Sequence, residues 1–540
     1  MLKATTEESA KWYESTKEKL SAEQLTDALL DCGLFADKVP PCFNSQGLAK
    51  FAKNYFAQYI ADTTNITSAN EKSVKKSIEK HCSDYIRYEA LRETNVPRHL
   101  GIPHPAAYAL QVFAIAKHWE KIATHCNKPD PQFSRIYVRH TGKCAVFEMN
   151  YKGNERYKNE EAEISWMTGS QYIVKADIAS CFPSIYTHTI PWALDGKDNA
   201  KQSNALSTSG NLLDKTTQNT RDRQTNGLLI GPHSSNVISE IILTSVDVEL
   251  QKKGYQKVFR HIDDYTFYAT DHDQAERFIR DLVIALRQYE LTLNDKKTQI
   301  LKLPRPSVEN WVQRLNNFPF LSTQELRFST VRAYLDLALE CAQSIGKYSP
   351  LNYAIQLLSK RQLNERAKRL YTQEAINLAL AYPYLSRLLD NYVFQPYLYD
   401  GQGSSIAKFC AALLESGLKK VYPDAIAHAI YYAMRYEIKI DLPEEKLIAV
   451  VALDDCLTNV LLYRYAKREN LQELQKGLKT HAQNLKQKSL RDIQKNWLLV
   501  YELWEDNDLK GKSQEFLLEL RKTGMQFIRF PQDEFVNVAL

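Results

Sequence analysis

Three aspartates occupy positions from which they could hold a metal ion. Asp263 and Asp264 are adjacent and lie between two runs of β-branched and aromatic residues, a pattern that predicts a hairpin with the pair at its turn. Neighbouring carboxylates repel one another unless a cation neutralises them, and carboxylate oxygens are ligands that suit a divalent metal. Asp177 lies at the end of an apolar run, where a lone aspartate is more often a turn or cap residue. Together the three predict a carboxylate metal site.

The dipeptide Asp454-Asp455 provides a contrast to the first pair. No strand pattern flanks it, and the surrounding sequence is typical of helices. We therefore expect these two side chains to form a helix cap or part of a solvated helix face, without a metal.

Two further segments could contribute to a site around the three aspartates. Gly231 and Pro232 form a turn that leads into a predicted helix, and a glycine there allows the backbone to approach a ligand closely. Residues 291–298 form a short alternating strand that ends in a basic turn containing Lys297. On its own, the second segment is typical of a surface hairpin with solvated lysines.

The elements around these residues predict three regions. Residues 1–95 are a helical N-terminal section, and helix-type spacing continues to about residue 122. Residues 96–305 are α+β, with a hairpin predicted at 135–149, and the polar stretch 195–226 predicts a mobile insertion or a lightly packed surface element. Residues 306–540 are all-α, either a HEAT-like α-solenoid of helical repeats or an irregular bundle. Candidate helices in this region are 331–343, 374–380, 407–414, 447–463 and 490–503.

Composition limits the classes of function. The chain has 540 residues, a net charge of +6 and only 18 glycines, which indicates a multidomain, helix-rich protein that could bind nucleic acid. Its 9 cysteines are scattered without zinc-ligand spacing, so we expect reduced thiols and a cytoplasmic location. No leader pattern and no apolar stretch of transmembrane length is present, so we expect no membrane partner.

Taken in order, the chemical segments resemble the motifs of reverse transcriptases. Asp177 and Phe182 resemble motif A, Gly231-Pro232 to Ser235 motif B, Asp263-Asp264 motif C, and residues 293–298 motif D. Flanking segments narrow the resemblance to the bacterial abortive-infection reverse transcriptases of the AbiK type, which act in antiphage defence. These segments are Ile102-Pro-His-Pro105, His188-Thr-Ile-Pro-Trp-Ala193 and Gln224-Thr-Asn-Gly227. The implied fold is a fingers and palm core followed by a helical-repeat domain.

The resemblance also implies roles for single residues. Asp177 and Asp263 would bind two Mg²⁺ ions, or Mn²⁺ in their place, with Asp264 in support. Phe182 would crowd the 2′-OH and select dNTPs, Lys297 would lie near the pyrophosphate, and the motif B residues Gly231, Pro232 and Ser235 would contact the nucleotide. Arg139, with Arg135 and Lys143 as further candidates, would hold the triphosphate. One departure is His261, which stands where reverse transcriptases usually have tyrosine.

Members of the abortive-infection group make DNA without an added template and prime it on a protein tyrosine. The resemblance therefore implies a single-stranded DNA product attached covalently to the enzyme, a homo-oligomer, and a non-coding RNA as a further partner. The chain has 31 tyrosines, and the sequence does not identify the priming one; Tyr13, Tyr55 and Tyr59 are candidates. Two alternatives remain: a template-copying reverse transcriptase that uses a non-coding RNA, and a non-catalytic nucleic-acid-binding scaffold on a polymerase fold.

Overall fold

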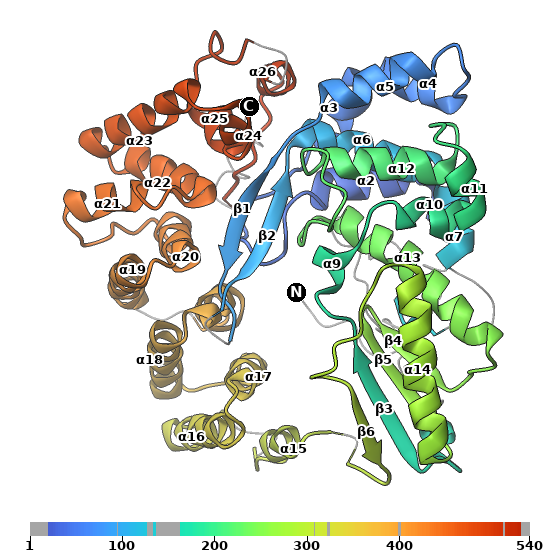
Figure 1. The fold of residues 1–540 in the computed structure, drawn as a ribbon. Coiled ribbons are helices and arrows are strands. Elements are labelled where there is room, and N and C mark those ends of the chain that lie inside the picture. The colour runs from blue at the N-terminus through green and yellow to red at the C-terminus, as the bar shows by residue number, and fades with distance from the viewer. Residues whose placement is uncertain are drawn as a thin grey trace.

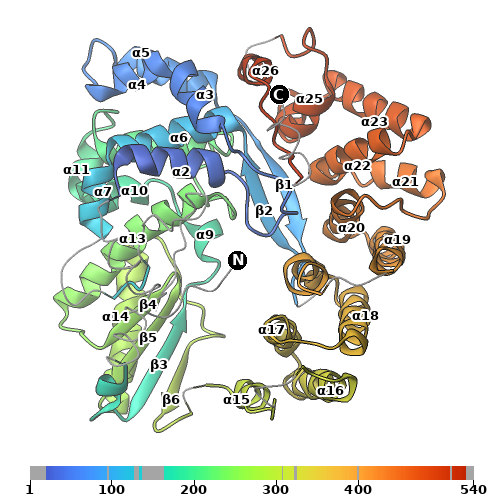
Figure 2. The same ribbon diagram turned by 180° about the vertical axis from the view of Figure 1, so that it is seen from behind.

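The computed structural model describes residues 20–93, 96–126, 133–136, 163–306, 308–320, 325–397, 401–510 and 514–530. In Figure 1 the N-terminal and central elements, blue to green, form one side of the molecule, and the later helices, yellow to red, form the other. A two-stranded hairpin runs between the two sides, as the reverse view in Figure 2 also shows. The end of the described chain returns to the N-terminal section, where Ile528 forms a backbone bridge with Phe43.

The N-terminal section is helical except for that hairpin. Its helices are α2 (Ala22–Cys32), α3 (Leu48–Tyr55), α4 (Ala57–Thr64) and α5 (Glu71–Lys80), followed after the hairpin by α6 (Pro105–Lys117) and α7 (Trp119–Cys126). Strands β1 (Tyr85–Ala90) and β2 (Arg98–Pro103) pair antiparallel. The prediction of a helical section with helix-type spacing to about residue 122 was therefore wrong for this hairpin. Its signal is visible in β1, where polar Arg87 and Glu89 alternate with buried Ile86, Tyr88 and Ala90.

A four-stranded antiparallel sheet forms the centre of the α+β region. Its strands lie in the order β4 (Val258–His261), β5 (Asp264–Ala269), β3 (Tyr172–Asp177) and β6 (Gln299–Lys302). Helix α14 (His272–Gln288) packs on β3 and β5, and α13 (His233–Lys252) packs beside α14. The rings of Phe267 on β5 and Phe278 on α14 stack with their centroids 4.4 Å apart. One face of the sheet is thus covered by two helices.

The polar stretch 195–226 is lightly packed only in its first half, where α11 has no buried residue; from Ser209 onward it is packed into the core, contrary to the prediction of a mobile or lightly packed element. It forms α11 (Lys197–Gln202) and α12 (Ser209–Asn219), which follow α9 (Cys181–Ser184) and α10 (Thr189–Asp195). Helix α12 is mostly buried because its polar side chains find partners inside the protein. Asn219 donates to the carbonyl of Ile78 at 2.6 Å, and Gln111 donates to the hydroxyl of Thr217 at 3.1 Å.

The described residues after β6 contain helices and no strand, as predicted. They comprise α15 (Asn310–Asn316), α16 (Phe328–Ile345), α17 (Ser349–Leu358), α18 (Glu365–Ala381), η1 (Pro383–Leu388), η2 (Asp390–Phe394), α19 (Gln402–Lys420), α20 (Pro423–Arg435), α21 (Glu444–Val451), α22 (Cys456–Arg468), α23 (Gln472–Asn484), η3 (Leu485–Gln487), α24 (Leu490–Gln494), α25 (Trp497–Leu503) and α26 (Glu515–Lys522). The predicted helices 447–463 and 490–503 are each divided in two. The helix predicted at 447–463 is interrupted at Asp454, whose backbone is left-handed with a φ of 53°. Helix α21 ends before this residue, and Asp455 then caps α22.

The C-terminal helices pack back against the N-terminal section. The ring of Trp497 on α25 lies 6.5 Å from that of Phe35 and 5.0 Å from that of Phe527. Phe516 on α26 stacks on Phe56 at 5.6 Å. No helix in the described part of the chain combines the length and the apolar character needed to cross a bilayer.

Candidate active site

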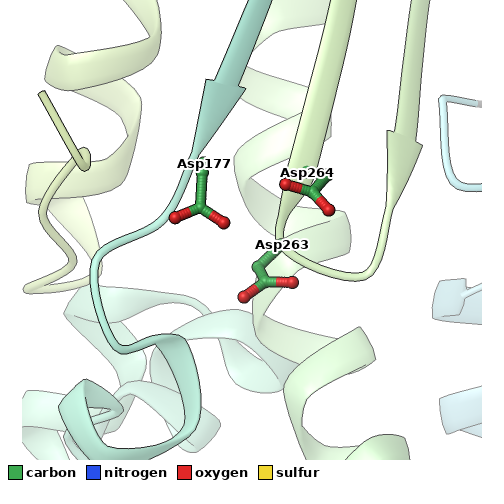
Figure 3. Close-up of side chains that lie close together, drawn as sticks. All are labelled: Asp177, Asp263 and Asp264. Atoms are coloured by element: carbon green, nitrogen blue, oxygen red, sulfur yellow. The ribbon is translucent and has the colours of Figure 1, made fainter. Parts of the chain in front are cut away.

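The three predicted aspartates lie together at one end of the central sheet. Asp177 is the last residue of β3 and pairs in register with Asp264, the first residue of β5. Asp263 precedes it in the turn, and each of the three offers a carboxylate oxygen within 4.8 Å of the others (Figure 3). Asp177 is buried and Asp264 is exposed, so the cluster opens to solvent on one side. The predicted convergence of the three aspartates is confirmed.

A tight turn between β4 and β5 presents Asp263 and Asp264. His261 pairs with Asp264, which leaves Ile262 and Asp263 as the turn residues. Ile262 has a φ of 56°, a left-handed conformation that is unfavourable for a β-branched residue. The backbone N–H of Ile178 donates to the carbonyl of Asp263 at 3.2 Å and ties the turn to the end of β3. The turn is therefore a strained element held by its surroundings.

A buried arginine supports this turn from behind. Arg260 on β4 is fully buried, and its guanidinium donates to the carbonyl of Ile262 at 3.0 Å. It also donates to both carboxylate oxygens of Asp247 at 2.9 Å and to Glu240 at 2.8–2.9 Å, both on α13. Burial alone would lower the pKa of Arg260, but the two carboxylates outweigh burial and keep the guanidinium charged. Ion pairs and a hydrogen bond thus connect α13 to the turn that holds the aspartate pair.

The charges of the cluster favour a bound cation. Although Asp264 is exposed on one side, desolvation of its carboxylate by the surrounding protein raises its pKa to about 6, and the negative charges of Asp263 and Asp177 add to the shift. Burial and the charge of Asp177 also raise the pKa of Asp263. A divalent cation would relieve this repulsion, and three carboxylates form the hard-oxygen donor set that Mg²⁺ and Mn²⁺ accept. The residues present therefore fit such a metal.

Asp177 is held in place by the segment that follows α14. The backbone N–H of Asn294 donates to the carbonyl of Asp177 at 2.8 Å, and its side-chain amide donates to the Asp177 carboxylate at 2.8 Å. The ammonium of Lys297 lies 3.2 Å from the same carboxylate. The sequence predicted Lys297 near the site but did not single out Asn294, because an asparagine in a polar turn is usually a turn residue.

The segment that resembles motif B approaches this region through a glycine turn. Gly231 has a φ of 136°, and a Cβ there would lie 3.0 Å from the Cβ of Ala36 and 3.4 Å from the carbonyl oxygen of Gly101. Only glycine fits this position without displacing a neighbour. Pro232 precedes the first residue of α13 as its N-cap, and Ser235 is buried in the first turn of that helix.

Residues 115–333 match the family model of reverse transcriptases, the RNA-dependent DNA polymerases. The matched region includes the central sheet and all three clustered aspartates. The chain carries a reverse transcriptase domain. Its activity class is that of an RNA-directed DNA polymerase, a nucleotidyltransferase, and such domains work with divalent metal ions.

Similar chains among solved structures include two yeast telomerases. Telomerase from Candida albicans, in complex with a fragment of telomeric RNA, is 12% identical, with 72% of this chain and 71% of that chain covered and a TM-score of 0.30. Apo telomerase from Candida tropicalis is 10% identical, with 73% and 68% covered and a TM-score of 0.30. A comparison with curated proteins gave no match.

Phe182 of the motif A segment lies in the chain that follows β3. It is half-buried in the short helix α9, five residues after Asp177, and its carbonyl accepts a hydrogen bond from the N–H of Leu228 at 2.7 Å. This bond joins the motif A segment to the strand-like segment that leads to Gly231. The two motifs predicted from the sequence are therefore adjacent.

Arg135 does not extend from a fingers hairpin toward the aspartates. Its backbone N–H donates to the carbonyl of Arg260 at 2.8 Å, so it lies along the edge of β4. Its guanidinium lies 4.1 Å from the ring centroid of Phe259, which stacks on Trp166 at 4.4 Å. The suggestion that Arg135 reaches into the site from a hairpin is thus not supported. The predicted strands at 137–149, with Arg139 and Lys143, lie outside the described residues.

The candidate priming tyrosines and His261 have distinct surroundings. Tyr59 is 4% exposed, and burial raises its pKa; Tyr55 packs edge-on against Phe516 at 5.0 Å, and burial raises its pKa as well. Both tyrosines are thus part of the packing of helices α3 and α4, while Tyr13 lies outside the described residues. His261 is largely exposed beside Asp264, and partial desolvation together with the charge of Arg260 lowers its pKa.

Proposed function

We propose that the protein is an antiphage-defence DNA polymerase that joins dNTPs without a template and primes synthesis on one of its own tyrosines. The observation that carries the catalytic part is the complete set of three carboxylates, Asp177, Asp263 and Asp264, within 4.8 Å inside the reverse transcriptase domain. The defence role, the priming and the template independence rest on the resemblance of the flanking segments to abortive-infection enzymes.

In this proposal Asp177 and Asp263 hold two Mg²⁺ ions, with Asp264 in support. When bound, the ions would make a hydroxyl a better nucleophile and neutralise the leaving pyrophosphate. Asn294 orients the Asp177 carboxylate through its hydrogen bond, and Lys297 supplies a positive charge at the same carboxylate. Phe182 limits the room for a 2′-OH and so favours dNTPs. Arg139, Gly231, Pro232 and Ser235 contribute to nucleotide binding.

The remaining parts of the proposal concern the whole chain. The helices after residue 306 would form a HEAT-like repeat domain beside a core of fingers and palm at 96–305, with residues 1–95 contributing to the fingers. We propose that this domain supports a homo-oligomer and that the enzyme acts in the cytoplasm, where the single-stranded DNA product stays attached to it. A non-coding RNA is a further proposed partner.

The decisive experiment is incorporation without template or primer. Purified protein is incubated with Mg²⁺ and each labelled dNTP, and the products are separated on a denaturing gel with and without protease. The test variant is Asp263→Asn/Asp264→Asn, and the matched control is Asp454→Asn/Asp455→Asn, which changes the same dipeptide at a helix cap. We expect a protease-sensitive ladder in the wild type and in the control, and none in the test variant.

The family match itself favours one second candidate, a template-copying reverse transcriptase, because the matched family is defined by RNA-dependent synthesis. Extension of a primed RNA template, with no product in its absence, would establish that candidate. No incorporation under either condition, with single-stranded nucleic acid still bound, would indicate a scaffold. If a protease-sensitive ladder forms without template or primer, mass spectrometry of the nucleotide-bearing peptide left after proteolysis would identify the priming tyrosine.

A further inference from the structure

The loop between α12 and the glycine turn ends in residues 224–227, the segment Gln-Thr-Asn-Gly, which the sequence marked by resemblance alone and to which the proposed function gives no task. In the structure this segment lies against motif A. The N–H of Gly227 donates to the carbonyl of Ile185 at 2.6 Å, and the N–H of Leu228 donates to the carbonyl of Phe182 at 2.7 Å. The end of the loop is therefore joined to the main chain of Phe182.

Arg221 holds the end of this loop in place. One nitrogen of its guanidinium, Nη1, donates to the carbonyl of Gly227 at 2.6 Å and also to the carbonyl of Asn226. Gly227 has a φ of 88°, and a Cβ there would lie 2.5 Å from this nitrogen and 2.9 Å from the carbonyl oxygen of Pro183. Only a glycine therefore lets the arginine and helix α9 both approach this residue.

The hydrogen bonds of Arg221 go to the main chain and not to a carboxylate. No acidic side chain in the described part of the chain forms an ion pair with it, and its neighbour Asp222 pairs instead with Arg491 of α24 at 2.6 Å. The Nε of Arg221 is buried and has no hydrogen-bond partner among the described residues, and the guanidinium carbon lies 5.9 Å from the ring centroid of Tyr85 on β1. Burying part of a guanidinium without a counter-ion costs free energy, so its place is explained better by the main chain that it holds than by stability.

We propose that Arg221 is a positioning residue for sugar selection: it holds the main chain of residues 226–227, which in turn keeps Phe182 in the place from which its ring excludes a 2′-OH. The hydrogen bond from Leu228 to the carbonyl of Phe182 is the last link in this series of contacts. A displacement of about 1 Å in a group that positions a substrate can change a rate about 100-fold. This inference deepens the proposed function and rests on it for the role of Phe182 in favouring dNTPs.

The contacts favour positioning over a direct contact between Arg221 and the nucleotide. Its Nη1 is occupied by two carbonyls, and its Nε is buried. The candidate metal site already has a cation of its own, Lys297, which lies 3.2 Å from the Asp177 carboxylate. The main chain of the arginine's own turn is anchored as well, because the N–H of Asp222 donates to the carbonyl of Ser83 at 2.9 Å. The arginine therefore links one fixed stretch of main chain to another.

The test compares kcat/KM for each dNTP with that for the matching rNTP, using the full chain and Mg²⁺. The variant is Arg221→Met, which keeps the aliphatic stem and removes the donors, and the matched control is Arg223→Gln, which removes the same charge from an exposed side chain of the same loop. Arg221→Met should lower the discrimination against rNTPs about 10- to 100-fold, mainly by raising the value for rNTPs, because a displaced ring leaves room for the 2′-OH. Arg221→Lys keeps a donor and should recover part of the discrimination, and the control should retain all of it. A general folding defect would lower both values together and leave their ratio unchanged.

Phe182→Ala separates a failure of this inference from a failure of the proposed function. It should relax the discrimination at least as far as Arg221→Met, and the double variant should relax it no further, because the arginine acts through the ring. Relaxation in Phe182→Ala without any in Arg221→Met would overturn this inference alone. Unchanged discrimination in Phe182→Ala would overturn the proposed role of that ring and this inference with it. A higher KM for dNTPs and rNTPs alike in Arg221→Met would assign the arginine to the nucleotide itself, which also overturns the proposal.

Hydrogen exchange provides a readout that needs no catalysis. Without nucleotide, the amides of Gly227 and Leu228 should exchange faster in Arg221→Met than in the wild type or in Arg223→Gln, because the carbonyls beside them lose the guanidinium. Unchanged exchange at these amides would overturn the inference even if the protein incorporated no nucleotide.

Discussion

Among single residues, Asp264 shows how the metal site and the stability of the fold are linked. Its pKa in the folded protein is raised from 3.8 to about 6, so its ionisation opposes folding. The stabilising contribution of the neutral carboxyl is complete below about pH 4 and is lost as pH rises through about 6. We therefore expect Asp264→Asn to raise the Tm in EDTA at about pH 8 and to leave it unchanged at about pH 4.

Magnesium provides the companion measurement for this residue. Mg²⁺ should raise the Tm of the wild type at about pH 8, because a ligand that binds only the folded state stabilises it, and Asp264→Asn should lose most of that rise. Asp336→Asn, which changes an exposed aspartate of α16, is the control and should retain it. A full Mg²⁺ response in Asp264→Asn would exclude this carboxylate from the metal site.

Asp455 offers a second prediction at this scale, away from the site. It is buried and caps α22 by accepting from the N–H of Thr458 at 2.8 Å, and burial raises its pKa to about 6, with the charge of Asp424 adding to the shift. Asparagine caps a helix as well as aspartate does and carries no charge. Asp455→Asn should therefore raise the free energy of unfolding by about 1–3 kcal/mol near pH 8 and by nothing near pH 4, measured with urea.

Asp454 serves as the comparison, because replacing it should change the free energy of unfolding in the opposite direction. Asp454 lies 3.1 Å from the imidazole of His481, and its interaction with that side chain lowers the pKa of Asp454. Its contribution to stability is present above the unfolded-state pKa and is lost as pH falls through the folded-state value. Asp454→Asn should thus lower stability near pH 7. If Asp455→Asn and Asp454→Asn both raised the free energy of unfolding, the buried charge of Asp455 would not explain its effect on stability.

At the scale of elements, the β4–β5 turn depends on the ionic network beneath it. Arg260→Met would leave the carboxylates of Glu240 and Asp247 buried without their cation, which typically costs about 3–5 kcal/mol. It would also remove the hydrogen bond to Ile262 that holds the turn of Asp263 and Asp264. We expect a large loss of stability in urea unfolding, together with loss of nucleotide incorporation.

Removing the whole network distinguishes its two roles. In Arg260→Met/Glu240→Gln/Asp247→Asn no unpaired charge remains, so most of the stability should return. Incorporation should stay low, because the turn still lacks its hydrogen bond from the arginine. Full recovery of incorporation in the triple variant would show that the arginine acts only by neutralising charge, and our account of the turn would be falsified.

The site was more predictable than the elements around it, for physical reasons. Asp177 and the pair 263–264 could be found because strand alternation and a turn are local signals. The partners of Arg260 could not, since they lie 13 and 20 residues earlier on a helix and sequence does not show which face meets the sheet. Helix α12 was mistaken for a surface element because its polar residues are satisfied by distant groups such as the carbonyl of Ile78.

At the scale of the whole molecule, the C-terminal helices are joined to the rest of the chain by contacts that local patterns do not reveal. Trp497 packs against Phe35, and Gln494 accepts from the N–H of Asp84 at 3.0 Å across 410 residues of sequence. The helical character of this region was predictable from its spacing, whereas its return to the N-terminal section was not. This closure places the hairpin β1–β2 between two parts of the molecule that it must hold together.

A buried tyrosine and a buried aspartate provide one of these links. Tyr88 on β1 donates to the carboxylate of Asp424 on α20 at 2.5 Å, and the N–H of Leu91 donates to the other oxygen at 2.9 Å. Tyr88→Phe should weaken this attachment by about 1–3 kcal/mol, because it removes a donor from a buried carboxylate. We expect faster hydrogen exchange across 85–103 with little change in the helices beyond, measured by mass spectrometry.

Tyr501→Phe is the matched control, since Tyr501 is similarly buried and donates to the carbonyl of Met525 at 2.7 Å without touching the hairpin. Unchanged exchange of the hairpin in Tyr88→Phe would show that β1–β2 is held by its other contacts. If the hairpin does loosen, the N–H of Gly101 on β2 should lose its fixed position against the carbonyl of Ile230, which it contacts at 3.0 Å beside the glycine turn before α13. The attachment of the C-terminal helices at Asp424 would then reach the glycine turn before α13 through the hairpin.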